Sequence, residues 1–86
     1  MGDQESVVDP NSPVYVYVQV ANLIEADIRA GRLPVGARLP GEQDLAVQYG
    51  IAKGTAARVA RELRERGLAI TVANKGTFIV EPPPSS

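Results

Sequence analysis

Residues 45–63 of the chain have the sequence LAVQYGIAKGTAARVAREL, which predicts two helices joined by a tight turn. Its apolar positions fall on two helical faces separated by Gly50, a residue type that permits a sharp turn between helices. Ala46 is small enough for the two helices to cross closely, while Ala56 and Val59 anchor the second helix in the core. This pattern is typical of a helix-turn-helix, which leaves the start of its second helix free to enter a DNA major groove.

The segment before this stretch predicts another helix. Between residues 17 and 30 the apolar side chains follow the i, i+3, i+4, i+8 spacing of one helical face, and Gly31 supplies a stop. Residues 14–18 alternate like a strand, so they form either a short strand or the entrance of the helix, and the helix begins somewhere in that range. Residues 37–39 can form a very short strand before Pro40 ends it.

The stretch itself divides into two more helices. The first is predicted over residues 42–49, with Gly41 as its N-cap and acidic side chains in the first turn, where the helix dipole favours them. The second is predicted over residues 53–66, and Gly67 closes it.

From residue 68 the apolar period changes from that of a helix to that of a strand. Residues 68–72 and 77–80 flank Asn74, Lys75 and Gly76, so a β-hairpin is predicted with its turn at these three residues. The predicted fold is therefore mainly α with a small β-hairpin, a three-helix winged helix-turn-helix.

Composition predicts one small domain with loose ends. Residues 1–13 are expected to form a flexible acidic arm, residues 14–80 the domain, and residues 81–86 a proline-rich linker or tail. The chain has 86 residues and lacks cysteine and histidine, so disulfides, thiolate metal sites and imidazole bases are ruled out. We therefore expect no enzyme activity and no cofactor. No apolar stretch approaches the roughly 20 residues that cross a bilayer, so we expect a cytoplasmic protein with no membrane contact.

The charge distribution favours a polyanionic partner although the net charge is −1. Residues 50–80 hold six bases and two acids, a local charge of +4, which leaves −5 on the rest of the chain. A basic segment on an acidic body is the footprint of a nucleic-acid face, because phosphate contacts act only over about a Debye length. From charge alone, a solvated charged helix remains the alternative.

Ordered pieces of the chain resemble the DNA-binding domain of the gluconate-repressor (GntR) family of bacterial transcriptional regulators. The resemblance spans about residues 17–80 and rests on these pieces: YVQVA at 17–21, IRAGRLPVGARLPGE at 28–42, LAVQYGIAKGT at 45–55, RGL at 66–68 and KGTFIV at 75–80.

The resemblance implies a set of DNA-facing positions at the two helix starts and the wing tip. They are Gln43, Ala52, Lys53, Gly54, Thr55, Ala73, Asn74 and Lys75. Lys53 can donate a hydrogen bond to a guanine edge or a phosphate; the alternative interpretation is that its charge is simply solvated. Thr55 suits phosphate, with helix capping as its alternative. Asn74 is needed for the turn whether or not it contacts DNA.

Several residues depart from the family pattern. The family commonly has serine where this chain has Gly41, another hydroxyl at Ala52 and an arginine at Ala57, so base reading is expected to be weakened. Arg58 could compensate for the arginine missing at Ala57. It lies one residue further along, however, so its side chain is rotated by about 100° around the helix and is not expected to reach the DNA groove equally.

Three further arginines are candidates for contacts with the phosphate backbone of DNA. Arg61 and Arg64 lie further along the helix and are expected to meet phosphates or water. Arg38 is a candidate phosphate clamp, or an ion-pair partner of Glu42 or Asp44.

The function that the resemblance implies is sequence-specific binding of double-stranded operator DNA by a transcriptional regulator. Repression is favoured over activation by likeness alone, and a homodimer on an inverted repeat is expected. The chain is either an excised DNA-binding piece or a naturally short protein, and a small-molecule effector is expected only if a C-terminal domain is missing.

Two alternative hypotheses for the function follow from the sequence. One is a winged helix used for protein association without DNA binding. The other is a nucleotide-binding enzyme, suggested by residues 52–55 and 74–77, but neither segment has the glycine-rich loop that wraps phosphates.

Overall fold

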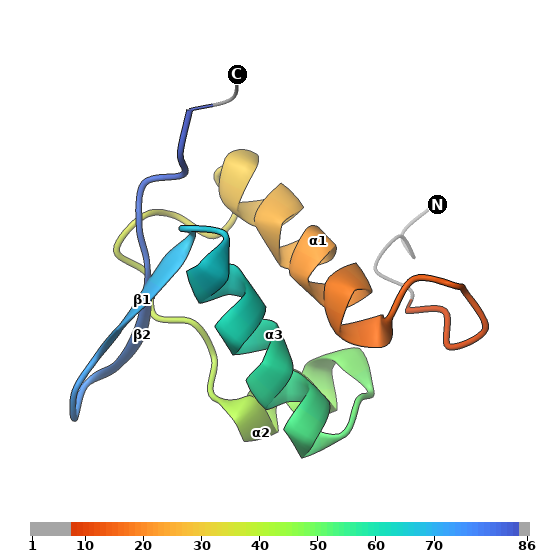
Figure 1. Ribbon diagram of the computed structural model, residues 1–86. Helices are drawn as coiled ribbons and strands as arrows, with labels where there is room; N and C mark the ends of the chain where they lie inside the picture. Colours follow the sequence, from red (N-terminus) through yellow and green to blue (C-terminus); the bar gives the residue numbers. More distant parts are fainter. Residues whose placement is uncertain (1–7, 85–86) are drawn as a thin grey trace.

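The computed structural model describes residues 8–84, which form three helices followed by a two-stranded antiparallel hairpin (Figure 1). In chain order the elements are α1 (Val16–Arg29), α2 (Glu42–Tyr49), α3 (Lys53–Glu65), β1 (Ala69–Val72) and β2 (Gly76–Ile79). Helix α3 contacts α1, α2 and β1, while the hairpin projects from one side of the helices (Figure 1). The predicted fold class is confirmed.

Helix α1 begins at Val16, which settles the open question about residues 14–18 in favour of a helix entrance. Its buried side chains are Val20, Ala21, Ile24 and Ile28. They recur at helical spacing, so one face of α1 packs on the core. The helix ends at Arg29, one residue earlier than predicted, because Ala30 is its C-cap.

Helices α2 and α3 meet at a tight turn. Helix α2 has the predicted bounds and the predicted N-cap, Gly41. Gly50 is its C-cap in the left-handed region at φ 66°, a conformation that residues with a Cβ adopt only with strain. Helix α3 ends at Glu65, one residue short of the prediction, and Arg66 is its C-cap.

The hairpin pairs Ala69 with Ile79 and Val72 with Gly76, so the strands are shorter than predicted at both outer ends. Asn74 lies in the turn at φ 65°, which confirms its turn-forming role. Ala69 and Ile79 are buried against the helices, so the base of the hairpin packs on the core, while β1 is exposed from Ile70 onward.

The segment before α2 runs along the free edge of β2. Leu39 N–H donates to the Thr77 carbonyl at 2.8 Å, and Ile79 N–H donates to the Ala37 carbonyl at 2.9 Å. The predicted strand over residues 37–39 is only a single bridge, Arg38 to Phe78, because Pro40 cannot continue the hydrogen-bond ladder. This pairing fixes Arg38 beside the hairpin.

The core is aliphatic and lies between the three helices and the hairpin. Its largest fully buried side chains are Leu45, Leu63, Leu68, Ile79, Val20 and Val59. Within residues 8–84 no polar or charged residue is buried, so the charged side chains of this part of the chain all lie at the surface.

The segment before α1 is tied to the helix by Gln19. The side-chain amide of Gln19 accepts from the Asp9 N–H at 2.8 Å and donates to the carbonyls of Asp9 and Val14 at 2.9 and 2.8 Å. The predicted division at residues 13 and 80 stays a prediction, and residues 1–7 and 85–86 of the predicted ends lie outside the described residues. No helix in the described part of the chain is long and apolar enough to cross a membrane.

Candidate nucleic-acid interface

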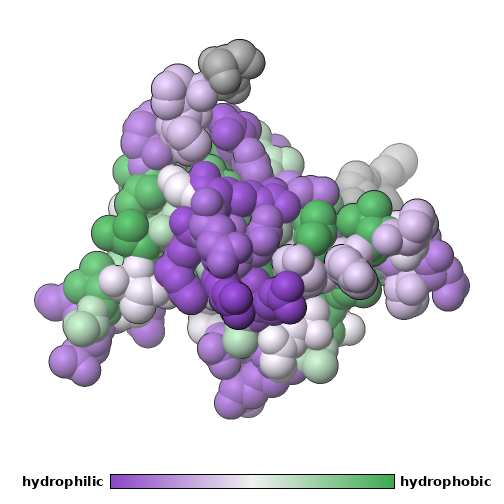
Figure 2. All heavy atoms as spheres, in the orientation of Figure 1, coloured by the Kyte–Doolittle hydropathy of each residue, from purple (hydrophilic) through white to green (hydrophobic). Residues whose placement is uncertain are grey.

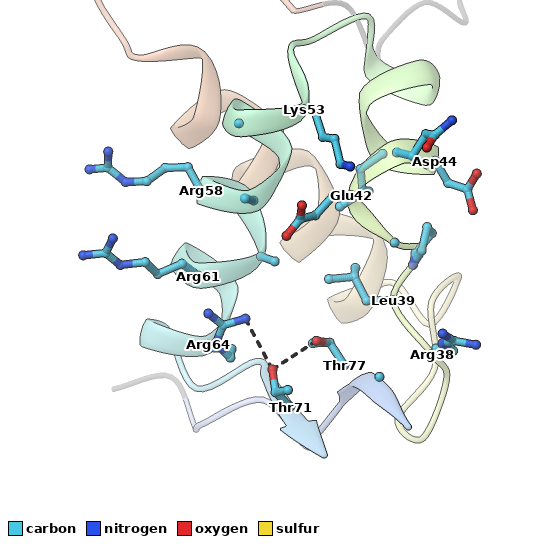
Figure 3. A pocket seen from close by; sticks show the side chains of 18 residues that line it. Arg38, Leu39, Glu42, Asp44, Lys53, Arg58, Arg61, Arg64, Thr71 and Thr77 are labelled. Atoms are coloured by element: carbon cyan, nitrogen blue, oxygen red, sulfur yellow. Dashed lines mark hydrogen bonds between the residues drawn. The ribbon is translucent and has the colours of Figure 1, made fainter. Parts of the chain in front are cut away.

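A concave surface of about 830 Å³ lies between the start of α2, one side of α3 and the inner face of the hairpin (Figure 3). We call it the groove. Its polar lining residues are Arg38, Glu42, Gln43, Asp44, Lys53, Arg58, Arg61, Arg64, Thr71 and Thr77. Side chains from three separate segments therefore converge on one open surface.

Most cations that line the groove have no ion-pair partner among residues 8–84, whereas most cations elsewhere have one. Within residues 8–84, four arginines form ion pairs: Arg29 with Glu25, Arg32 with Asp27, Arg66 with both Glu25 and Glu62, and Arg61 with Glu65. The other five cations have no carboxylate within 4.0 Å among residues 8–84; they are Arg38, Lys53, Arg58, Arg64 and Lys75. The first four of these line the groove, and none of the four is ion-paired within the described part of the chain.

Helix α3 carries most of this charge. Arg58, Arg61 and Arg64 are exposed along it, and Figure 2 shows strongly hydrophilic side chains gathered over α3. Arg61 lines the groove and is ion-paired, but its 3.4 Å contact with Glu65 joins side chains that are both more than 60% exposed. Such a surface pair contributes about 0–1 kcal/mol, so Arg61 can readily exchange its partner.

Arg38 lines the groove without an ion pair to an acid of residues 8–84. Neither Glu42 nor Asp44 lies within 4.0 Å of it, so the ion pair weighed as its alternative is absent from the described residues. Its side chain lies against Gly76 of β2 instead. Both acids nevertheless line the same groove, where they reduce its positive potential.

A chain of hydrogen bonds joins α3 to the hairpin across the groove. Arg64 Nη1 donates to Thr71 Oγ1 at 3.3 Å, and Thr71 Oγ1 lies 3.1 Å from Thr77 Oγ1 (Figure 3). Both threonines face inward because they are cross-strand partners on the face that also carries Ala69 and Ile79. The sequence reasoning missed Thr71 and Thr77, although period-two alternation from Ala69 places them on this face.

Arg58 is held by an aromatic pair at the start of α1. Its guanidinium carbon lies 4.3 Å from the centroid of the Tyr17 ring, and Arg58 Nη2 donates to the Tyr17 hydroxyl at 3.3 Å. The ring of Tyr15 stacks on that of Tyr17 at 6.0 Å with an interplanar angle of 15°. Sequence reasoning did not associate these tyrosines with the site.

Comparison with known proteins identifies the family. The family model described as bacterial regulatory proteins, gntR family, matches residues 16–79. The chain belongs to the GntR family. It is 41% identical over 64 residues to the HTH-type transcriptional regulator SmoD of Agrobacterium fabrum, a match that covers 74% of this chain and 27% of SmoD. The chain thus spans about a quarter of that relative's length.

Solved structures of GntR proteins share the fold. The chain resembles YtrA of Sulfolobus acidocaldarius, a GntR-family transcription factor, with a TM-score of 0.79 and 25% identity over 88% of this chain and 80% of YtrA. It also resembles the DNA-binding domain of AraR in complex with operator ORX1, with a TM-score of 0.70 and 27% identity over 81% of this chain and 90% of that domain. The fold is a winged helix-turn-helix.

The predicted DNA-facing residues of this GntR domain fall into three places. The groove brings together Arg38, Gln43, Lys53, Gly54 and Arg58. Ala52 and Thr55 instead line a second hollow of about 320 Å³, next to the turn between α2 and α3. Asn74 and Lys75 are exposed at the hairpin turn, as is Ala73, and none of the three lines the groove.

Thr55 is not the capping residue of α3, and its contact with a phosphate stays a prediction. It is half-buried, and the N-cap of α3 is Ala52, which makes no side-chain capping bond. Capping therefore does not explain Thr55. Because Ala52 leaves the first N–H groups of α3 without a side-chain acceptor, those groups remain available to an anion.

Proposed function

We propose that this chain binds double-stranded DNA sequence-specifically as the DNA-binding domain of a transcriptional regulator. In this proposal the start of α3 enters the major groove and the hairpin turn lies at the minor groove. The observation that carries the proposal is the placement of four cations without described acidic partners, Arg38, Lys53, Arg58 and Arg64, around one groove.

The charge argument depends on counterions. A cation already paired within the protein has little attraction left for a phosphate, whereas an unpaired one can replace a counterion on the DNA backbone. The ion pairs of Arg29, Arg32 and Arg66 lie outside the groove. The cations without described acidic partners are thereby concentrated around the groove.

Family membership supports the same surface. AraR, whose DNA-binding domain superposes on this chain with a TM-score of 0.70, has been solved in complex with operators. SmoD is named a transcriptional regulator. We therefore propose operator DNA as the partner, and a cytoplasmic location follows from that partner.

Base reading is proposed to rest on few side chains. Lys53 and Gln43 are exposed on the groove and have the donors needed for a base edge or a phosphate, while Gly54 lets the DNA approach closely. Ala52 and Ala57 add no polar atom. Asn74 and Lys75 are proposed to lie against the minor groove or its rim, and Thr55 to contact a phosphate from beside the turn.

Assembly and control are proposed from the family. Two copies would bind an inverted repeat with their α3 helices in successive major grooves, about 34 Å apart. Occupation of the operator would exclude or reposition polymerase, and repression is proposed over activation by likeness to the family alone. A small-molecule effector is proposed only for a domain outside these 86 residues.

The test is a titration of the chain against labelled duplex pools at about 50 mM and 200 mM salt. Phosphate contacts predict weaker binding at the higher salt, and base reading predicts that particular sequences are enriched at both. Salt-dependent binding without enrichment would refute sequence-specific recognition. Absence of binding at the lower salt would favour the protein-association alternative.

A further inference from the structure

We propose that Tyr17 positions Arg58 as a clamp for a DNA phosphate at the lip of the groove, and that Arg58 does not read bases. The inference rests on the proposed DNA-binding function and deepens it. It assigns the start of α1 to the DNA interface, through a contact between residues 41 positions apart.

Tyr17 contacts one face of the Arg58 guanidinium. The guanidinium stacks on the Tyr17 ring at 4.3 Å and donates a 3.3 Å hydrogen bond to the Tyr17 hydroxyl, and the Tyr15 ring stacks on the Tyr17 ring. A guanidinium has five N–H donors, and this hydrogen bond uses one of them. The remaining donors have no side-chain acceptor among residues 8–84 and can meet one from solvent, since Arg58 is exposed.

A structural role alone accounts poorly for this arrangement. Arg66 shows what such a role looks like in this chain: it joins Glu25 and Glu62 at 2.9 Å each and is 21% exposed. Arg58 is instead ordered without being neutralised, since no carboxylate of residues 8–84 lies within 4.0 Å of it. An ordered, unneutralised guanidinium is suited to a bidentate contact with a phosphate supplied by a partner.

The direction of the side chain selects phosphate over base. Figure 3 shows Arg58 pointing away from Lys53 and Glu42, which face the interior of the groove. Phosphates line the edges of a DNA major groove, whereas base edges form its floor. With Lys53 directed to the floor, Arg58 is therefore placed at the edge.

Preorganisation is the physical benefit of the tyrosine. A free arginine side chain loses rotamer freedom when it binds DNA, and that loss weakens binding. Stacking on Tyr17 orders Arg58 before the DNA arrives. Because these contacts favour the present orientation of Arg58, they disfavour the rotation that would let it replace the arginine that the family commonly has at Ala57.

The experiment is a double-mutant cycle on the full chain. Dissociation constants are measured for wild type, Arg58→Ala, Tyr17→Leu and the double variant, on an enriched duplex and on an unrelated one, over a range of salt. Arg58→Ala should weaken both duplexes by a similar several-fold factor and reduce the slope of log K against log salt by about 0.9. Tyr17→Leu should weaken binding in the wild-type background and have little effect once Arg58 is alanine.

Two results would overturn the inference. One is a change of sequence preference at a single base pair in Arg58→Ala, which would make Arg58 a base reader. The other is full additivity of the two substitutions, which would show that Tyr17 does not act through Arg58. If circular dichroism shows that Tyr17→Leu is unfolded, Tyr17→Phe replaces it in the cycle. Tyr17→Phe removes the hydroxyl acceptor, and its smaller effect must likewise vanish in the Arg58→Ala background.

Lys53→Ala separates this inference from the function on which it rests. If Lys53→Ala weakens binding and Arg58→Ala does not, DNA binding stands and the clamp is wrong. If wild type binds neither duplex, the proposed function itself is wrong. Arg32→Ala removes an exposed arginine that lies off the groove, so it serves as the matched charge control.

Discussion

Arg38 lies directly against Gly76: its Nε is 2.7 Å from the point where a Cβ on Gly76 would stand. Gly76 also has a φ of 126°, a conformation that L residues rarely adopt. The glycine therefore serves two purposes at the base of the hairpin turn. It lets β2 begin in this conformation, and it leaves room for the arginine that the bridge to Phe78 brings to the groove.

Gly76→Ala is expected to reduce both stability and DNA affinity. The positive φ should cost about 1–3 kcal/mol of unfolding free energy. The new methyl must also displace the Arg38 side chain, which is flexible enough to move and would then leave its place on the groove. Urea denaturation measures the first effect, and DNA titration measures the second.

Arg38→Ala combined with Gly76→Ala distinguishes backbone strain from crowding. The double variant relieves the clash but keeps the strained φ, so it should be about as unstable as Gly76→Ala alone. Recovery of wild-type stability in the double variant would show that crowding, not backbone strain, was the cost.

Lys53→Ala is expected to lower DNA affinity at least several-fold, because it removes an exposed cation without a described acidic partner from the start of α3. The control Arg32→Ala removes a cation that is 66% exposed and paired with Asp27 off the groove. It should change affinity little. Equal losses for the two variants in the same titration would contradict the assigned DNA-binding face.

Gly54→Ala should separate stability from binding. A Cβ at this position meets nothing within 4 Å, and alanine favours a helix over glycine by up to about 1 kcal/mol. The melting temperature should therefore rise. The methyl projects from the groove-lining side of α3, so DNA affinity should fall because the close approach is lost. A rise in both quantities would place Gly54 away from the DNA.

Ala52→Ser is expected to stabilise the fold. Ala52 is the N-cap of α3 with φ −68° and ψ 153°, an extended conformation from which a serine oxygen can reach the N–H of the third helical residue. A cap of this kind contributes about 1 kcal/mol. Thermal denaturation of Ala52→Ser beside Ala52→Gly tests the hydroxyl, since glycine suits the position but supplies no side-chain acceptor.

The elements of the fold could be predicted from the sequence because each is set by local spacing. The buried face of α1 and the left-handed turn at Gly50 follow from residues a few positions apart. The site was only partly predictable, because it depends on how distant segments meet. The stacking of Arg58 on Tyr17 arises where α3 meets the start of α1, and Thr55 lines a hollow together with Val8 and Pro10 of the segment before α1. No local pattern encodes either relationship.

Glu25 gives the fold a dependence on pH that is separate from the groove. Its carboxylate accepts from Arg29 Nε and Arg66 Nη1, both at 2.9 Å, and so ties α1 to the end of α3. The hydrogen bond from Arg29 is the main cause that lowers the pKa of Glu25; partial burial opposes it, and Arg66 lowers the pKa further. The folded state therefore holds this carboxylate ionised to lower pH than the unfolded chain does.

The sign of the effect follows from that shift. A lowered pKa in the folded state stabilises the protein fully above the unfolded value of about 4.3, and the contribution is lost as the pH falls through the folded value. Glu25→Gln should cost about 1 kcal/mol of unfolding free energy at pH 7. In urea denaturation, the difference between wild type and Glu25→Gln should shrink as the pH is lowered below about 4. A difference that stays constant between pH 7 and pH 3 would mean that Glu25 acts through packing rather than through its charge.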